Sequence, residues 1–389
     1  MNASEPADAV VGAGIVGLAV AYHLAKSGRR VEVFERHPRP QGASVRNFGL
    51  IWPIGQPDGR RRATALRSRA IWADVLGASG IWHAQVGSLH LAYHADELQV
   101  LEEFADTAAR DDFACELVPP DRVRERSPLA RQEGLRGGLY SPHEIVVDPR
   151  DVAVSLPRWL EANWPITFRF GTLVQRIEGD CLQTPAGAAR FGRCFVCAGD
   201  ELQVLYPDAL ASLGLHRCKL QMMRTSPLGW RIGPPLAAGL TLGHYDAFAG
   251  CPSLPALKQR FATELPDHVR FGIHVMVSQT GAGELTIGDS HEYDEAITPF
   301  DNPAIDRLVL EYLRSFADLD GVEIASRWHG VYVRHPHEPF CVLPLAANVI
   351  ALVGFGGAGM TLSFGAAEEA VAIATANCAP PSISSPPAP

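Results

Sequence analysis

The sequence lacks an excess of positive charge, because 34 Lys and Arg residues are outnumbered by 43 Asp and Glu residues. Nucleic-acid binders and general membrane-surface binders need a basic face, so the net charge of −9 argues against both classes, although it leaves room for a local basic pocket. Long apolar runs are also missing. Residues 9–21 and 350–360 are apolar and glycine-rich, but both runs are too short to cross a bilayer. We therefore expect no membrane span.

Targeting and metal signals are equally sparse. Residues 1–6 contain no cationic stretch, so they do not resemble a secretory signal. The 8 cysteines form no paired framework, which favours reduced thiols in the cytoplasm. Cys194 and Cys197 form a single CxxC in an apolar setting, which favours a buried strand over a zinc site. His335 and His337 flank a proline and are expected at the surface. We expect no metal site, and the sequence does not set the oligomeric state.

What the sequence does contain is a globular composition, 47% hydrophobic over 389 residues, long enough for two domains. Hydrophobic periodicity divides the chain into elements. Helices are predicted at 15–27, 60–78, 96–110, 148–163, 303–316 and 363–377. Strands are predicted at 8–11, 31–35, 86–93, 166–170, 173–177, 195–198, 219–225, 269–278, 284–288 and 350–353.

Rossmann-like segments thus stand at both ends, with mixed β-structure between them. The sequence predicts an α/β (α+β) fold, in which a Rossmann-type dinucleotide-binding domain is discontinuous and holds an inserted, mixed antiparallel β-sheet substrate domain. The nucleotide domain is assigned to residues 1–85, 146–215 and 326–378. The substrate domain is assigned to 86–145 and 216–325. The proline-rich tail, 379–389, is expected to be disordered.

A dinucleotide fingerprint opens the chain as Gly12-Ala13-Gly14-Ile15-Val16-Gly17. It follows a strand, begins a helix, and precedes an acid, Glu35, near the expected spacing. Gly12 permits a tight turn, Gly14 lets the backbone approach a pyrophosphate, and Gly17 lets helix and strand pack closely. The helix N-terminus favours phosphate, and Glu35 can accept from ribose hydroxyls, which disfavours the 2′-phosphate of NADP. A βαβ unit without a nucleotide is the alternative.

The fingerprint does not separate FAD from NAD, but a second glycine cluster bears on that choice. It reads Gly354-Phe355-Gly356-Gly357-Ala358-Gly359-Met360-Thr361, between the last strand and the last helix. Here backbone and a helix N-terminus approach a flat ligand, which suits a flavin because its reduced form carries negative charge. A glycine-rich turn without a ligand is the alternative.

With these motifs in order, the chain resembles the FAD-dependent amine and amino-acid oxidase family, which includes glycine oxidase, sarcosine oxidase and D-amino-acid dehydrogenase relatives. The resemblance covers about residues 8–375. It rests on the fingerprint with Glu35 and Arg36, on residues 171–174, on 196–199, on Trp328-His329-Gly330, and on the second glycine cluster. The resemblance also implies that a segment containing Ser44, Arg46, Asn47, Phe48 and Gly49 lies against the flavin, that the Val174 backbone meets adenine, and that Ala198 and Gly199 adjoin the cofactor.

One departure from the family concerns the anion site. Amino-acid oxidases usually carry an Arg shortly after the W-x-G, whereas here Tyr332 takes that place and Arg334 lies two residues later. In a strand the two side chains share a face. A Tyr, Arg and His group suits a phosphonate as well as a carboxylate. The alternative is that Arg334 pairs with an acid such as Glu338. The family's flavin-attaching cysteine has no counterpart near the W-x-G, so we expect non-covalent FAD.

The resemblance implies hydride transfer from the carbon beside an amine to flavin, giving an imine that hydrolyses. The expected partners are a small zwitterionic amine and O₂ or another electron acceptor. Tyr245 and Tyr332 are candidates to orient the substrate, and His291 could lie near the ring or merely in a polar turn. Lys219 or Arg46 could supply positive charge for O₂ reduction, and a structural role for Lys219 is the alternative.

More narrowly, residues 46–56 and 218–222 resemble a sub-branch linked to aminophosphonate breakdown, with substrates such as N-methyl-2-aminoethylphosphonate. Carboxylate substrates such as glycine, sarcosine or D-amino acids are the alternative. Three other classes are alternatives: an NAD-dependent dehydrogenase, a nucleotide-binding regulator without turnover, and a tRNA-modifying flavoenzyme. The acidic charge argues against the last of these.

Overall fold

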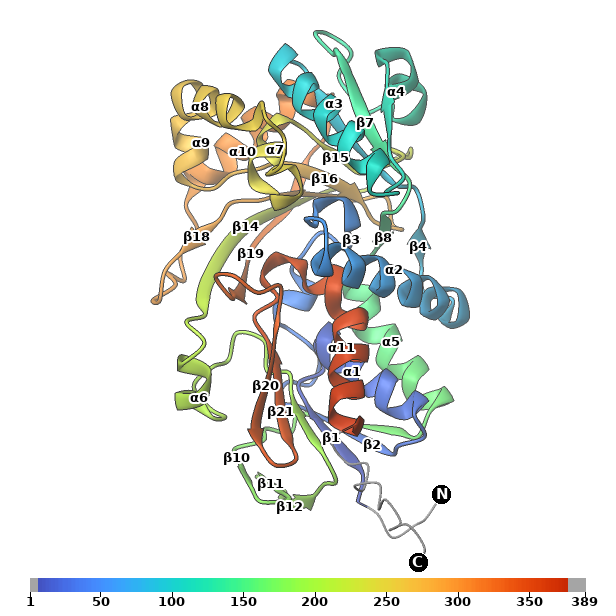
Figure 1. Cartoon of the computed structure of the whole chain (residues 1–389), viewed down its shortest axis with the longest axis vertical. Coiled ribbons are helices and arrows are strands. Elements are labelled where there is room, and N and C mark those ends of the chain that lie inside the picture. The colour runs from blue at the N-terminus through green and yellow to red at the C-terminus, as the bar shows by residue number, and fades with distance from the viewer. Residues whose placement is uncertain (1–5, 377–389) are drawn as a thin grey trace, which may run out of the picture.

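A six-stranded, mostly parallel sheet forms one half of the molecule, the lower half in Figure 1; the computed structural model describes residues 6–376. Its strand order is β20-β21-β13-β1-β2-β9, and only β20 runs antiparallel to its neighbour. The strands are β1 (Asp8–Val11), β2 (Val31–Glu35), β9 (Ile166–Phe170), β13 (Cys194–Val196), β20 (Cys341–Ala346) and β21 (Val349–Val353). Parallel sheets need cover on both faces, which explains the apolar runs of β1 and β13.

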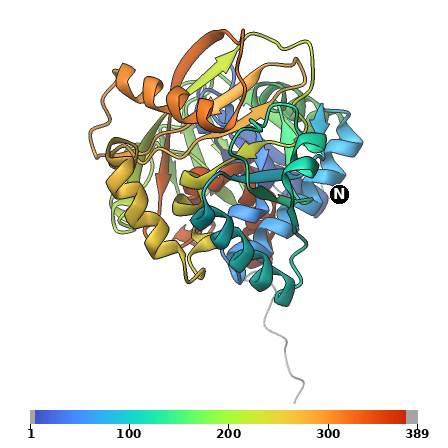
Figure 2. The ribbon, with the colours of Figure 1, turned by 90° about the horizontal axis from the view of Figure 1, so that it is seen from above.

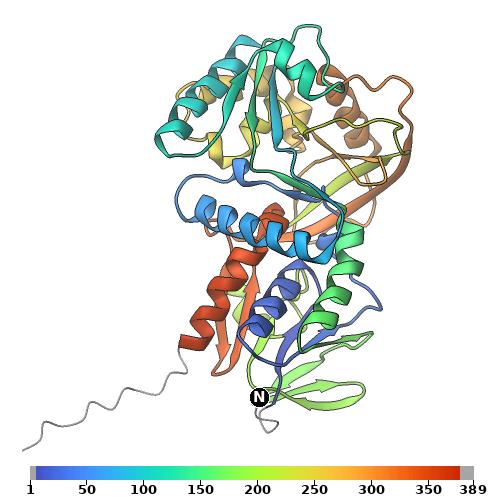
Figure 3. The same cartoon turned by 90° about the vertical axis from the view of Figure 1, so that its right-hand side faces the viewer.

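Helices cover this sheet and connect it to the rest of the chain. They are α1 (Ile15–Lys26), α2 (Arg60–Ser79), α5 (Pro149–Asn163) and α11 (Gly359–Ala376). Helix α1 is buried almost all round, as an element between a sheet and another helix must be. Helix α2 lies across the waist of the molecule (Figure 3) and contacts α11, where Trp72 Nε1 donates to the Met360 carbonyl over 2.9 Å.

A nine-stranded sheet forms the other half. Its order is β18-β14-β17-β16-β15-β5-β7-β6, with β19 also paired to β14. The strands are β5 (Ser88–Ala92), β6 (Glu116–Val118), β7 (Gly137–Ser141), β14 (His216–Thr225), β15 (Leu236–Ala237), β16 (Met276–Gln279), β17 (Leu285–Gly288), β18 (Glu292–Tyr293) and β19 (Ile324–Arg334). Viewed from above, its helices lie around the sheet (Figure 2). They are α3 (Ala95–Arg110), α4 (Pro120–Arg126), α7 (Gly239–His244), α8 (Leu254–Glu264), α9 (Pro266–Arg270) and α10 (Pro303–Phe316).

Two small antiparallel sheets and several short helical turns complete the described chain. One sheet is β10 (Arg176–Glu178), β11 (Cys181–Thr184) and β12 (Gly187–Arg190); the other is β3 (Leu50–Ile51), β8 (Ile145–Val147) and β4 (His83–Ala84). The short helices are η1 (Ala43–Val45), η2 (Pro53–Gly55), α6 (Pro207–Ala211), η3 (Asp246–Phe248) and η4 (Gly356–Ala358). No helix within residues 6–376 is long and apolar enough to cross a membrane.

Several predicted elements differ from the observed ones. The strand predicted at 269–278 is wrong in its first part, because α9 ends at Arg270 and β16 begins only at Met276. The antiparallel region also contains α7 and α8, which the sequence analysis missed. Leu254, Leu257 and Phe261 form a buried stripe on α8 at helical spacing, which was the available signal.

The domain assignment stays a proposal. Residues 324–334 of β19 pair with β14 in the larger sheet, although most of them were assigned to the nucleotide domain. The tail assigned to 379–389 lies outside the described residues.

Glu144 is a fully buried carboxyl that ties the short helix η2 to strand β5. Its Oε1 accepts from the Ile54 N–H and its Oε2 from the Ser88 hydroxyl, both over 3.0 Å. Burial raises the pKa of Glu144 from 4.5 to about 7. The native state therefore holds this proton more tightly than the unfolded state does, and the resulting stability is complete below about pH 4.5 and is lost as the pH rises through about 7.

We expect Glu144→Gln to remove this dependence. The unfolding free energy of the wild type relative to the variant should fall by roughly 3 kcal/mol between pH 4.5 and pH 8, measured by urea denaturation. A wild-type-to-variant difference that stays constant with pH would show that Glu144 does not hold the proton.

Candidate functional site

The carboxyl ends of parallel strands bring three glycine-containing segments together. Val11 of β1 pairs with Val196 of β13, which in turn pairs with β21. The segments that follow these strands, 12–17, 197–199 and 354–361, therefore meet at one edge of the sheet. Ligands of open α/β sheets bind at such an edge.

The glycines of the fingerprint are required by close backbone contacts. Gly12 has φ +102°, and a Cβ there would collide with the carbonyl oxygen of Cys197. A Cβ on Gly17 would collide with the carbonyl oxygen of Gly12, so α1 can pack this closely on its turn only without a side chain. The sequence interpretation of these two glycines agrees with these contacts.

Two helix N-termini begin in these segments. Helix α1 starts at Ile15, whose N–H donates to the Ser44 hydroxyl over 2.9 Å. Helix α11 starts at Gly359, after the turn η4. The positive ends of both helix dipoles favour an anionic ligand at this edge.

Glu35 ends β2 beside the same turn. Its Oε2 accepts from the Ala13 N–H over 2.9 Å and its Oε1 from the His37 N–H over 3.0 Å. A carboxylate has about four acceptor positions, so Glu35 retains capacity for hydroxyl donors such as those of a ribose.

A cavity of about 540 Å³ runs along this edge and reaches the larger sheet. The proposed cofactor residues that line it are Gly12, Gly14, Ile15, Val16, Glu35, Arg36, Ser44, Arg46, Asn47, Phe48, Val174, Ala198, Gly199, Gly354, Gly356, Gly357, Gly359 and Met360. A glycine-lined cradle, two helix N-termini and an acid at the end of β2 fit a dinucleotide such as FAD.

The remaining proposed cofactor residues lie beside the cavity and do not line it. They are Ala13, Gly17, Gly49, Ala358 and Thr361. The Thr361 hydroxyl accepts from the Trp52 N–H over 2.9 Å, so it fixes the neighbouring loop.

Tyr332 and Arg334 meet the second glycine cluster. Tyr332 lines the cavity, and its hydroxyl oxygen would lie 3.7 Å from a Cβ on Gly357. The Arg334 side chain would lie 3.5 Å from a Cβ on Gly356. Burial raises the pKa of Tyr332 well above its ordinary value, so its hydroxyl remains a proton donor at neutral pH.

Arg334 lies apart from the acid that the sequence suggested as its partner. Glu338, the alternative partner considered from the sequence, lies 3.7 Å from Arg60 instead. Within residues 6–376 no carboxylate lies within ion-pair distance of Arg334, and its guanidinium contacts the Tyr293 hydroxyl. The pairing of Arg334 with Glu338 was therefore wrong.

The two candidate cations occupy different places. Arg46 lines the cavity and donates to the His329 carbonyl over 3.2 Å. Lys219 is 1% exposed and lies away from the cavity, where it donates to backbone carbonyls and lies 3.0 Å from the carboxylate of Asp301. Alternation along β14 explains this, because Leu220 lines the cavity and Lys219 points to the opposite face. The contacts of Lys219 favour its structural alternative.

The other two candidates, Tyr245 and His291, do not line the cavity. The Tyr245 hydroxyl contacts the Met276 sulfur at 3.6 Å, and burial raises the pKa of Tyr245. The His291 ring centre lies 6.3 Å from that of Tyr332. Next to His291 the structure places two histidines that the sequence analysis missed, His244 and His274. They come from separate segments with no shared spacing, so no sequence signal joined them.

Burial keeps the His291 imidazole uncharged at neutral pH. Loss of hydration lowers the pKa of His291, and the neighbouring His274 adds to this shift. His274 Nε2 lies 3.0 Å from Oδ1 of Asp289, a cavity-lining acid that the sequence analysis also did not single out.

Comparisons with known proteins agree with this geometry. The family model described as "DAO: FAD dependent oxidoreductase" matches residues 9–373. The mitochondrial pyruvate dehydrogenase phosphatase regulatory subunit of Mus musculus is 27% identical over 56% of this chain and 26% of its own length. Mitochondrial sarcosine dehydrogenase of Homo sapiens is 26% identical over 49% of this chain and 22% of its own length. The chain thus spans about a quarter of the length of these curated relatives.

Solved structures resemble the chain along nearly its whole length. L-proline dehydrogenase from P. horikoshii has a TM-score of 0.78 at 18% identity, covering 96% of this chain and 94% of the other. Glycine oxidase from Bacillus cereus ATCC 14579 has a TM-score of 0.77 at 18% identity, covering 96% and 95%. The predicted fold class is confirmed.

We expect Gly17→Ala to weaken FAD binding. The added Cβ collides with the Gly12 carbonyl, and overpacking of this kind costs ~1–3 kcal/mol, or about tenfold or more in affinity if the turn must open. Flavin absorbance per chain after purification, followed by FAD titration, measures the effect.

Gly77→Ala is the matched control. Gly77 lies in α2, and an added Cβ there meets no atom within 4 Å. This variant should bind FAD as the wild type does. Unchanged flavin content in Gly17→Ala would contradict the assignment of this turn to the cofactor.

Proposed function

The chain belongs to the family of FAD-dependent oxidoreductases, and from that membership we propose that it oxidises the C–N bond of a small amine carrying an anionic group. The preferred substrate class is the aminophosphonates, such as N-methyl-2-aminoethylphosphonate. The proposed products are a carbonyl compound and a free amine, with O₂ reduced to H₂O₂. We propose that this takes place in the cytoplasm and that the FAD is held non-covalently.

The observation that carries the proposal is the guanidinium of Arg334, which lies beside the second glycine cluster and has no ion-pair partner within residues 6–376. A half-buried cation without an acidic partner is costly unless a ligand supplies the anion. Tyr332 and Tyr293 add hydroxyl donors next to it. The three groups together suit an anion that presents several oxygens.

FAD supplies the hydride acceptor when it is bound, and the chain's own residues do the rest. Arg334 and Tyr332 would hold the anionic end, so that the amine end extends along the cavity. Burial and the positive charge of Arg334 both disfavour a protonated amine, and the uncharged amine is the form that can lose hydride. Glycines at 356 and 357 leave room for close approach.

The overall reaction balances with O₂ and water as co-reactants. The amine loses a hydride from carbon and a proton from nitrogen to become an imine, which water hydrolyses to a carbonyl compound and an amine. The two electrons pass to O₂, which takes up two protons as H₂O₂. Arg46 lines the cavity and would favour negative charge on reduced oxygen.

We prefer a phosphonate over a carboxylate because its three oxygens match the three donor side chains, Arg334, Tyr332 and Tyr293. The resemblance of residues 46–56 to the aminophosphonate sub-branch supports the same choice. A carboxylate substrate is the second candidate, since one relative is named sarcosine dehydrogenase and one structural neighbour glycine oxidase.

A binding role without turnover is the candidate of another class. It is favoured by similarity to a protein named as a regulatory subunit. Bleaching of the flavin by a substrate under anaerobic conditions would exclude this alternative.

We expect Arg334→Ala to raise the KM for the anionic amine. A charge-assisted hydrogen bond is worth about 1.5–3 kcal/mol, which corresponds to roughly 10- to 150-fold in KM. Arg334→Lys should recover part of the loss, because it restores the charge without the planar fork. Steady-state peroxide assays measure both variants.

Arg67→Ala is the control, because Arg67 is an exposed arginine paired with Glu368 at 2.6 Å on α11. Its KM should equal that of the wild type. An Arg334→Ala variant with wild-type KM would place the anion elsewhere.

The substrate class is tested with a panel of 2-aminoethylphosphonate, its N-methyl form, glycine, sarcosine and D-amino acids. We expect the phosphonates to bleach the flavin anaerobically and to yield peroxide in air. Activity on the carboxylates alone would refute the phosphonate preference and retain the amine oxidase. Bleaching without peroxide in air would identify an acceptor other than O₂.

A further inference from the structure

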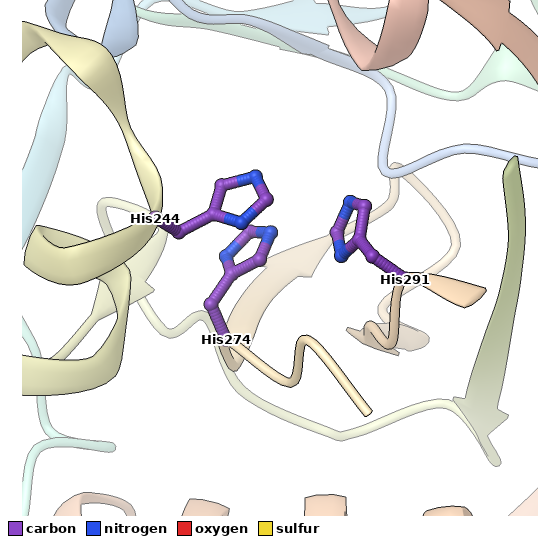
Figure 4. A group of neighbouring side chains, drawn as sticks. All are labelled: His244, His274 and His291. Carbon is purple, nitrogen blue, oxygen red and sulfur yellow. The ribbon is translucent and has the colours of Figure 1, made fainter. Parts of the chain in front are cut away.

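Three histidines from separate elements converge beside the cavity (Figure 4). His244 ends α7, His274 precedes β16, and His291 precedes β18. One ring nitrogen from each lies within 4.8 Å of the others. The rings of His244 and His274 stack with centres 3.7 Å apart, and the ring of His291 lies 4.4 Å from that of His244. Such proximity is unfavourable for protonated rings and suits uncharged ones.

Contacts to neighbouring groups already orient two of the three rings. His291 Nδ1 lies 3.0 Å from the Gly272 carbonyl, so this nitrogen donates and Nε2 keeps its lone pair. His274 Nε2 lies 3.0 Å from the Asp289 carboxylate, while its buried Nδ1 has no hydrogen-bond partner. The Gly272 carbonyl behind His291 is the usual kind of support of a metal-binding histidine, whereas the Asp289 carboxylate lies close to His274 without a hydrogen bond to it.

We propose that His244, His274 and His291 form a binding site for a divalent transition-metal ion, with Zn²⁺ as the representative ion. Imidazole nitrogen suits Zn²⁺ and its transition-metal neighbours, whereas Mg²⁺ and Ca²⁺ prefer oxygen. Three protein ligands leave a fourth position for water or another ligand.

The His244 ring, now stacked on that of His274, must rotate to complete the site. Zn–N bonds of about 2.0–2.1 Å in tetrahedral geometry place two ligand nitrogens roughly 3.4 Å apart. His244 can make this adjustment because it is exposed and its ring forms no hydrogen bond within the described chain. His274, only 2% exposed, and His291, 8% exposed, provide the fixed part of the site.

The site adjoins the cofactor cavity without sharing its cradle. Asp289 lines the cavity and contacts His274, and the His291 ring centre lies 6.3 Å from that of Tyr332. The metal site does not depend on the proposed amine oxidation, since neither the ligands nor their supports belong to the anion site. Either proposal can therefore fail while the other holds.

The test is metal binding by the full-length chain after chelator treatment. Zn²⁺ is titrated by calorimetry and Co²⁺ by its visible absorption, with flavin absorbance recorded separately. We expect saturable binding of one ion per chain. His244→Gln and His291→Gln should each weaken this binding by more than about tenfold, since even the loss of a supporting contact behind a ligand costs 10–100-fold.

His337→Gln is the matched control, because His337 is an exposed histidine in the other histidine pair, with ring centres 6.1 Å apart. It should bind Zn²⁺ as the wild type does. Circular dichroism checks that the variants are folded. Of these changes, substitution of the exposed His244 should disturb folding least. No saturable binding by the wild type, wild-type affinity in His244→Gln, or equal loss in His337→Gln would each overturn the proposal.

Discussion

The convergence of parallel strands at one sheet edge is the constraint on which the site depends. Because β1, β13 and β21 run in the same direction and in register, the turns that follow them must meet. Two of those turns begin α1 and α11, so two helix N-termini face one cavity. Such close packing of the turns requires glycine at positions 12 and 17, because a side chain at either position would collide with backbone.

In the larger sheet, the alternation of side chains along each strand decides which residues face the cavity and which face away from it. Along β14, Leu220 faces the cavity and Lys219 faces away, into a cluster of carbonyls and a carboxylate. Along β19, Tyr332 and Arg334 lie two residues apart and both reach the second glycine cluster. The same rule thus places Tyr332 at the cavity and removes a candidate cation, Lys219, from it.

The histidine cluster shows how the large sheet can add a site of its own. His274 and His291 meet because β16 and β17, which lie beside them, are paired, and His244 reaches them from the end of α7. Asp289 links this cluster to the cavity through His274. A metal ion held there would stand next to the candidate substrate region, whereas the FAD cradle lies on the parallel sheet.

The sequence by itself determined the nucleotide half, because its signals are local. A strand, a glycine turn, a helix and Glu35 follow one another within about thirty residues. Backbone sterics explain why each glycine of the turn stands at its position. Only the tertiary structure decided the partners of Arg334 and Lys219 and the meeting of His244, His274 and His291. Those contacts join residues far apart in the chain, and strand pairing, which brings them together, leaves no periodic trace in the sequence.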